Sequence, residues 1–389
     1  SLLLAGGLAA CAEQPAPTDP RLAAVVRQRE PHVPDADAVA RGRQIFRHES
    51  WGDEVFWTDT LRLHEVVQAA VSPALALAVG PKVDADRLPP GFLAQADLTS
   101  PATTIELLRR DAVLGLKRPA PAEGEHRELG TTCALCHSTV NNSVAPGVGR
   151  RLDGWPNRDL NVGAIVALSP ALPPATKAVL NSWGPGRYDA YFNQDGVSDP
   201  VLLPPAYGLR GVALETYTGE GPVSYWNNYV AVTQMHGRGS FSDPRLGIDI
   251  RAQPDLVTPK LPALRDYQLT LEAPTPPPGS FNPVAADRGR QVFNGPARCA
   301  TCHIPPTFTD AGLTLHAPAE TDMDPVRATR GANAGYRSTP LRGAWHRAPY
   351  FHDGSAPTLT AVVEHYVGAL GLSLTGQQKA DLVEYLKSL

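Results

Sequence analysis

Two copies of the motif Cys-x-x-Cys-His constrain this chain of 389 residues more than any other feature. Two thiols at this spacing can reach the two vinyl groups of one haem, and the imidazole that follows ligates the iron. A zinc ribbon would place its cysteine pairs roughly 15–20 residues apart, and a redox disulfide needs no histidine after its second cysteine. We therefore expect two covalently bound c-type haems. The thioether bonds would form at Cys133, Cys136, Cys299 and Cys302, and the proximal iron ligands would be His137 and His303.

The fifth cysteine, Cys11, closes the short apolar segment LLLAGGLAAC. Small residues directly before such a cysteine are typical of a lipoprotein signal, in which the cysteine carries the lipid. The segment is too short to cross a membrane as a helix. We predict a signal segment at 1–11 and a tether at 12–33. The protein would then be lipid-anchored on the periplasmic side of a bacterial membrane, and we expect this to be the outer membrane. An ordinary cleaved signal, which would leave a soluble periplasmic protein, is the alternative.

The chain also contains an internal repeat, in which the same anchors recur in the same order around each Cys-x-x-Cys-His motif. RGRQIF at 41–46 recurs as RGRQVF at 288–293, LRG at 209–211 recurs at 341–343, and ALRDYQLTL at 263–271 matches DLVEYLKSL at 381–389. The last anchor places its apolar residues on one helical stripe. We expect a mainly α protein of two cytochrome-c-like haem domains, in each of which the first and last helices cross.

The two repeat units differ in length, because the first carries insertions, mostly before its haem motif. We predict an enlarged N-terminal cytochrome-c-like domain at 34–272, a proline-rich linker at 273–282 and a C-terminal cytochrome c domain at 283–389. The formal net charge of −4 gives no electrostatic case for binding nucleic acid. Contact with a membrane is expected only through the lipid.

The segment STPLRGAWHRAPYFHDGSAPTLTAVVEHY at 338–366 resembles the signature of the bacterial di-haem cytochrome c peroxidase and MauG family. The resemblance implies that the C-terminal haem passes electrons and that the N-terminal haem meets peroxide. It also implies a distal ligand eight positions after the threonine of the Thr-Leu pair, which is Tyr366. Other candidates for distal ligands are His365 and Met323 near the second motif, and Met235 and His236 in the first unit.

Peroxide chemistry also needs a group that moves a proton between the two oxygens. The family uses Gln and Glu for this, and the nearest counterpart in this sequence is Gln234. Glu215 and Glu220 are possible substitutes for the glutamate. The simpler interpretation of these two residues is that they are exposed acids in a loop. His236 could also be an acid–base group or a surface residue.

The resemblance and the repeat suggest further residues with roles near the haems. Arg210 and Arg342 are candidates for pairing with propionates, His352 for a place near a haem or in a tight turn, and Trp226 and Trp345 for inter-haem relays or packing.

We therefore expect an exported oxidoreductase of the peroxidase and MauG type. Its partners would be a periplasmic electron donor or acceptor and hydrogen peroxide or dioxygen. Two other hypotheses remain open at this point. One is an electron carrier with no substrate, and the other is a haem-based binding or sensing lipoprotein.

Overall fold

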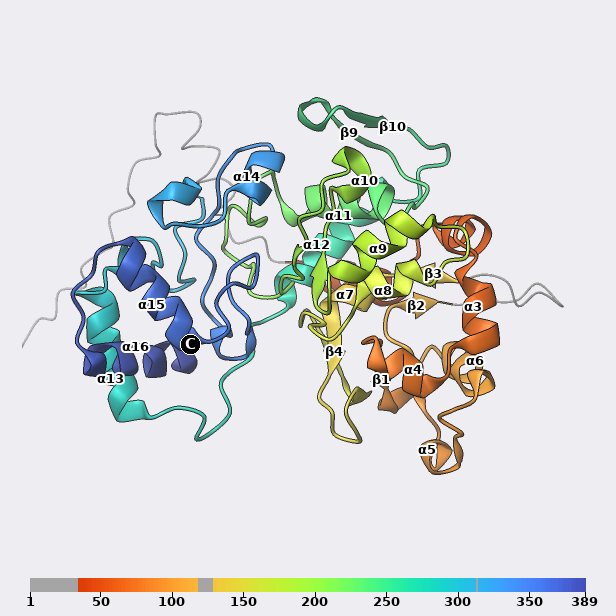
Figure 1. Ribbon diagram of the computed structural model, residues 1–389, viewed down its shortest axis with the longest axis horizontal. Coiled ribbons are helices and arrows are strands. Elements are labelled where there is room, and N and C mark those ends of the chain that lie inside the picture. Colours follow the sequence, from red (N-terminus) through yellow and green to blue (C-terminus); the bar gives the residue numbers. More distant parts are fainter. Residues whose placement is uncertain (1–33, 118–128, 313) are drawn as a thin grey trace, which may run out of the picture. The chain divides into compact units, whose positions relative to one another are not determined.

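The computed structural model describes residues 34–117, 129–312 and 314–389 (Figure 1). Cys11 and the predicted signal and tether segments lie outside the described residues. Pro34–Leu389 form one compact unit, which we divide into a first lobe (34–272) and a second lobe (283–389). Within the described part of the chain, every helix is too short or too polar to cross a membrane.

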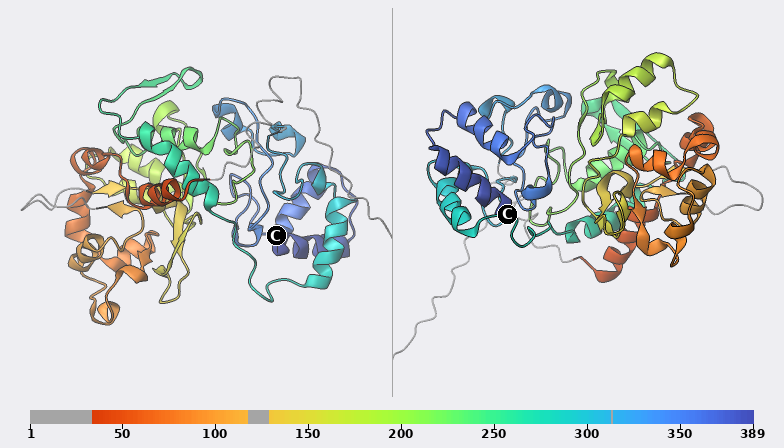
Figure 2. Two further views of the ribbon diagram at one scale, coloured as in Figure 1. Left: turned by 180° about the vertical axis from the view of Figure 1, so that it is seen from behind. Right: turned by 60° about the horizontal axis from the view of Figure 1, so that its bottom comes forward.

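The first lobe is organised by the crossing of α2 (Ala36–His48) and α12 (Leu261–Thr270) (Figure 2). The Asp35 carboxylate caps α2 by accepting a hydrogen bond of 3.0 Å from the backbone N–H of Ala38. The helices touch at Gly42, where a Cβ would lie 1.9 Å from the carbonyl oxygen of Ala263. One turn on, the rings of Phe46 and Tyr267 pack edge to face with centroids 5.5 Å apart.

The second lobe repeats this crossing with α13 (Pro283–Asn294) and α16 (Gly376–Ser388), which lie side by side in Figure 1. A Cβ at Gly289 would lie 2.0 Å from the carbonyl oxygen of Asp381. Phe293 and Tyr385 again pack edge to face, at 5.2 Å. The predicted crossing of the first and last helices is therefore found in both repeat units, and the mainly α fold class is confirmed.

The other α-helices are short. In the first lobe they are α3 (Leu63–Ala70), α4 (Pro73–Ala78), α5 (Phe92–Gln95), α6 (Pro101–Arg109), α7 (Ala134–His137), α8 (Val162–Ala167), α9 (Pro174–Ser182), α10 (Phe192–Asp195) and α11 (Val223–Thr233). In the second lobe they are α14 (Val326–Arg330) and α15 (Leu359–Ala369). A π-helical turn spans Phe56–Thr60, and single 3₁₀ turns span Ala85–Arg87, Pro244–Leu246, Thr258–Lys260, Cys299–Thr301, Pro318–Glu320 and Ala344–His346.

In the described part of the first lobe, five two-stranded ladders pin the loops. One is parallel and pairs β1 (Val83–Asp84) with β5 (Val148–Gly149). The antiparallel ladders pair β2 (Leu116–Lys117) with β3 (Gly130–Thr131), β4 (Ser138–Val140) with β6 (Arg151–Asp153), β7 (Arg187–Tyr188) with β8 (Val201–Leu202), and β9 (Phe241–Asp243) with β10 (Ile248–Ile250). Because β4 follows His137 directly, its ladder fixes the end of the first Cys-x-x-Cys-His motif.

Separate apolar cores stabilise the two helix crossings and the segment between α2 and the first Cys-x-x-Cys-His motif. One core surrounds Phe46 and Tyr267, and a second surrounds Phe293 and Tyr385. A third core includes Leu107 of α6. The segment at 271–282, which contains the predicted linker, forms neither helix nor strand.

Candidate functional site

The two motif histidines are held in the same way by the backbone. The Nδ1 atom of His137 lies 3.0 Å from the carbonyl oxygen of Pro204, and that of His303 lies 2.9 Å from the carbonyl oxygen of Phe308. A carbonyl only accepts, so each Nδ1 donates and each Nε2 keeps its lone pair. Burial lowers the pKa of both imidazoles, which favours the neutral ring. A neutral imidazole oriented through Nδ1 is the usual form of a metal-binding histidine.

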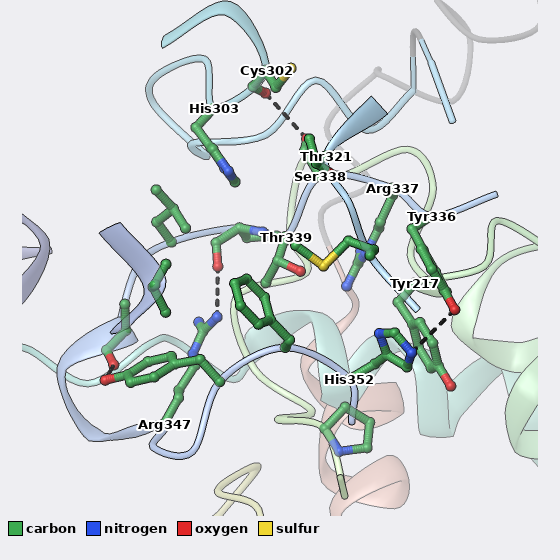
Figure 3. A pocket seen from close by; sticks show the side chains of 18 of the residues that line it. Tyr217, Cys302, His303, Thr321, Tyr336, Arg337, Ser338, Thr339, Arg347 and His352 are labelled. Atoms are coloured by element: carbon green, nitrogen blue, oxygen red, sulfur yellow. Dashed lines mark hydrogen bonds between the residues drawn. The ribbon is translucent and has the colours of Figure 1, made fainter. Parts of the chain in front are cut away.

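His137 and His303 line one cavity of about 390 Å³, which is within the size range of cofactor sites. Figure 3 shows the side chains of His303 and Arg337 entering this cavity from different segments. Cys299 and Cys302 also line it. Its wall in the second lobe is largely apolar and includes Leu341, Leu359, Val363, Leu382 and Leu386.

Three arginines that line this cavity lack carboxylate partners. Buried Nε and Nη1 of Arg158 and buried Nε of Arg337 have no hydrogen-bond partner. Desolvation, with the nearby charge of Arg347, lowers the pKa of both Arg158 and Arg337 to about 10. Arg347 itself donates to Tyr207 Oη at 3.1 Å and to the carbonyl oxygen of Pro340 at 2.7 Å. Buried cations without an anion are costly, so the site fits a cofactor that brings carboxylates, as haem does with its propionates.

The arginines of the LRG repeat, by contrast, lie away from the cavity. Arg210 and Arg342 are exposed, and their Nε atoms donate to the carbonyl oxygens of Leu269 (3.1 Å) and Pro306 (3.0 Å). The prediction that these two arginines pair with propionates is therefore not supported by their position. The repeated element contributes its leucines instead, because Leu209 and Leu341 both line the cavity.

The structure separates the three distal candidates of the second lobe. Tyr366 and Met323 line the cavity. Burial raises the pKa of Tyr366 to about 12. His365 does not line the cavity, because its Nε2 lies 2.8 Å from the carbonyl oxygen of Thr321 and the ring packs against Phe351. Tyr366, the next residue on α15, faces the site instead of His365.

The first-lobe ligand candidates Met235 and His236 and the catalytic candidate Gln234 do not line the cavity. Met235 is buried in the core of the first helix crossing. His236, at a positive φ of 60°, stacks on Phe56 with ring centroids 3.6 Å apart. Gln234 accepts a hydrogen bond of 2.8 Å from Tyr188 Oη and donates one of 3.0 Å to Asn193. Met235, His236 and Gln234 therefore make structural contacts and do not reach the cavity.

Glu215 and Glu220 are buried, with 6% and 7% of their surface exposed, so their interpretation as exposed loop acids is wrong. Glu215 lines the cavity. Its carboxylate accepts from the backbone N–H of Val223 at 2.7 Å and pairs with Arg265, whose Nε is 3.1 Å away. Glu220 does not line the cavity, and it accepts a hydrogen bond of 3.1 Å from Tyr191 Oη.

Sequence reasoning missed two amides on the same side of the cavity as Glu215. Asn227 on α11 and Gln268 on α12 line it, and Asn227 Nδ2 donates to Gln268 Oε1 at 2.7 Å. No local pattern marked them, since each occupies an ordinary position on a helix face. Among the described residues of the first lobe that line the cavity, His137 is the only one with a side chain of His, Met, Cys or Lys type.

The remaining candidates fall into two groups. Trp226 and His352 line the cavity, and His352 Nε2 lies 3.2 Å from Tyr336 Oη. Trp345 does not line it, because its indole N–H donates to the carbonyl oxygen of Pro274 at 3.2 Å and the ring packs edge-on to Trp155. Trp345 therefore ties the segment between the lobes to the second lobe, and Trp226 alone of the two tryptophans faces the site.

Comparison with solved structures gives partial matches. Hydrazine synthase of Kuenenia stuttgartiensis, pressurised with 20 bar xenon, is 23% identical with a TM-score of 0.30, over 49% of this chain and 73% of its own. A MauG-like protein associated with microbial copper homeostasis is 20% identical with a TM-score of 0.35, over 50% and 74% of the two chains. Both scores are too low to support an argument about the whole chain.

Sequence comparison is more specific. Residues 335–366 match the family described as RoxA-like, cytochrome c-like, and this stretch includes Arg337, His352 and Tyr366 of the cavity. The methylamine utilization protein MauG of Methylorubrum extorquens is 31% identical over 153 residues, which are 33% of this chain and 42% of that protein. The chain thus matches less than half the length of this curated relative. In these matched stretches the chain is similar to the MauG and di-haem cytochrome c peroxidase-like family, and this similarity supports haem as the cofactor.

Proposed function

We propose that the protein is a di-haem c-type cytochrome of the bacterial periplasm that acts as an oxidoreductase. In this proposal the haem of the second lobe exchanges electrons with a periplasmic donor or acceptor, and the haem of the first lobe reacts with hydrogen peroxide or dioxygen. The observation that carries it is that His137 and His303, both oriented through Nδ1, line one cavity. A lipid at Cys11 would hold the protein at the membrane.

Each haem, when bound, supplies an iron that changes oxidation state. Cys133 and Cys136 would hold the first haem, and Cys299 and Cys302 the second, through thioether bonds. The unpaired N–H groups of Arg158 and Arg337 would donate to propionate oxygens. These contacts would orient both cofactors and neutralise cations that burial otherwise disfavours.

A reactive first haem would need a coordination position that no side chain of the protein takes. The described first-lobe residues that line the cavity provide no second imidazole or thioether, and their phenol groups are those of Tyr207 and Tyr217. Glu215, which accepts a hydrogen bond from Arg265, would be the acid–base group for a substrate in this cavity. Asn227 and Gln268, hydrogen-bonded to each other, add polar side chains to the lining of the same cavity.

The second haem is suited to electron transfer if a side chain closes its sixth position. Tyr366 is the proposed distal ligand, and Met323 is the alternative that also lines the cavity. A phenolate oxygen favours ferric and higher iron, whereas a thioether favours the ferrous state. Because burial raises the pKa of Tyr366 to about 12, ligation would release a proton at neutral pH.

Mass spectrometry and EPR of the purified protein test this function. We expect two covalently bound haems, one high-spin ferric signal, and loss of that signal on reaction with hydrogen peroxide. Glu215→Gln should slow the reaction about 10²–10⁴-fold, while Glu272→Gln, at an exposed position, should leave it unchanged. Two low-spin haems that ignore peroxide would instead indicate an electron carrier, and a response only to a small ligand would indicate a sensor.

A further inference from the structure

The phenol of Tyr207, in the wall of the cavity, meets a histidine of the second lobe. Tyr207 is only 2% exposed, and it lies three positions after Pro204, whose carbonyl oxygen holds His137. Its Oη atom lies 2.6 Å from Nε2 of His346. A glycine leaves room for this ring, because a Cβ at Gly343 would lie 2.9 Å from the same Oη. The two side chains thus form a buried pair beside the segment that orients His137.

The geometry makes Tyr207 the donor and His346 the acceptor of this hydrogen bond. A separation of 2.6 Å is typical of an O–H donor and shorter than the usual range for an N–H donor. The oxygen of Tyr207 already accepts a hydrogen bond of 3.1 Å from Nε of Arg347. Burial, with the charges of Arg347 and Arg158, lowers the pKa of His346 to about 4. The imidazole is therefore neutral at neutral pH, and its Nε2 can accept a proton.

Burial also determines what happens when Tyr207 loses an electron. It raises the pKa of the phenol, which therefore keeps its proton at neutral pH. Removing the electron alone would leave a cationic ring in a buried place, at a high cost. An oxidised phenol is a much stronger acid than an imidazolium, so the proton can pass to Nε2 of His346. Trp155 holds that imidazole in place, since the two rings stack with centroids 4.1 Å apart.

We propose that Tyr207 is a redox-active tyrosine, which gives one electron to a haem that peroxide has oxidised and its phenolic proton to His346. The O–H bond of Tyr207 breaks and an N–H bond forms at Nε2 of His346, which leaves a neutral tyrosyl radical and an imidazolium. The oxidant rests on the proposed function: hydrogen peroxide takes up two electrons and two solvent protons and becomes two waters. One electron comes from Tyr207 and the other from a haem iron.

Freeze-quench EPR of the haem-loaded, full-length protein mixed with hydrogen peroxide tests the proposal. We expect a radical signal that narrows when ring-deuterated tyrosine is incorporated and that disappears in Tyr207→Phe. Tyr229→Phe is the matched control, because Tyr229 is also buried but donates at 2.7 Å to the carbonyl oxygen of Ala190, which is too weak a base to take up the proton. This control should keep the signal. A signal that survives in Tyr207→Phe would overturn the proposal.

A second variant, His346→Gln, tests the proton transfer by itself. Glutamine can still accept the hydrogen bond of Tyr207 but cannot take up its proton, so the radical should form about 10²–10⁴-fold more slowly. Equal haem content in each variant shows that a folding defect is not the cause. If the radical forms at the wild-type rate, His346 has only a structural role and the proposal is wrong.

Photogenerated ruthenium(III) tris-bipyridine, a one-electron oxidant, separates this inference from the proposed function. If peroxide does not react but the ruthenium oxidant produces the signal that depends on Tyr207, the proposed function is contradicted and the redox role of Tyr207 stands. If peroxide reacts with the protein and neither oxidant produces a radical that Tyr207→Phe removes, the inference is overturned and the proposed function stands.

Discussion

Replacing Gly289 with alanine tests whether the helix crossing holds the second lobe together. The added Cβ would lie 2.0 Å from the carbonyl oxygen of Asp381, so α13 and α16 would have to separate by roughly 1.4 Å to reach an ordinary contact of 3.4 Å. The atom in the way belongs to the backbone, so no side-chain rotation relieves the clash. The cost therefore falls on the packing between the two helices.

That cost can be worked out from the side chains buried between the helices. Phe293, Leu382, Tyr385 and Leu386 are each at most 8% exposed. At about 2 kcal/mol each, and with a gap wider than the roughly 0.5–1 Å that forfeits a quarter to a half of the contact energy, the loss is about 4 kcal/mol or more. Alanine has a better helix propensity by about 1 kcal/mol, which leaves a net destabilisation of about 3 kcal/mol.

Guanidinium unfolding of the haem-loaded protein, followed by circular dichroism, measures this change. Gly368→Ala is the matched control, because Gly368 lies in α15 and a Cβ there meets no atom within 4 Å. The control should gain about 0.5–1 kcal/mol. If Gly289→Ala proved as stable as Gly368→Ala, close approach of the two backbones would not be the reason for glycine at this position.

Three further variants test the site and its surroundings. Burial raises the pKa of Asp53 from 3.8 to about 8, so the stability that its protonated form contributes is complete below about pH 4 and lost as pH rises through 8; Asp53→Asn should flatten this part of the pH–stability curve. Arg158→Met should lower the midpoint potential of a haem, because a nearby cation favours the reduced iron, while Arg210→Met, away from the cavity, should leave both potentials unchanged. Tyr366→Phe should change the ferric optical spectrum of one haem only, and an unchanged spectrum would favour Met323 as the ligand.

The helix crossings were predictable because the repeat preserves the residues that make them possible. RGRQ places a glycine where each first helix meets the last one, and the shared tyrosine packs on a shared phenylalanine. The close approach of two helices at a glycine depends on the size of the side chain, and this size is known from the sequence alone. The orientation of His137 and His303 depends instead on carbonyls of Pro204 and Phe308, which no motif identifies.

Met235, Arg210 and Arg342 do not line the cavity, for a different reason. Met235 was a candidate because the chain has only two methionines, yet a rare side chain can still be a core residue, and Met235 is one. Arg210 and Arg342 were candidates because they repeat, but repetition of the LRG element reflects its turn, with φ of +77° at both Gly211 and Gly343. Arg158 and Arg337, the arginines that face the cavity, do not recur at matching positions of the repeat. Their burial without a hydrogen-bond partner arises only in the folded structure, so no sequence pattern marks it.

The two lobes contribute different side chains to the cavity, and we expect their chemistry to differ for this reason. Both lobes share the helix crossing and a carbonyl-held histidine, which under the proposed function would together hold one haem in each lobe. Only the second lobe places Tyr366 and Met323 in the cavity, whereas the first places Glu215 there and no second haem ligand of the imidazole or thioether kind among its described residues. In the proposed function a further protein ligand would favour electron transfer at the second iron, and a position without one would leave room for a substrate at the first. The same scaffold would then support two different iron sites, and the distinction would rest on side chains outside the repeated anchors.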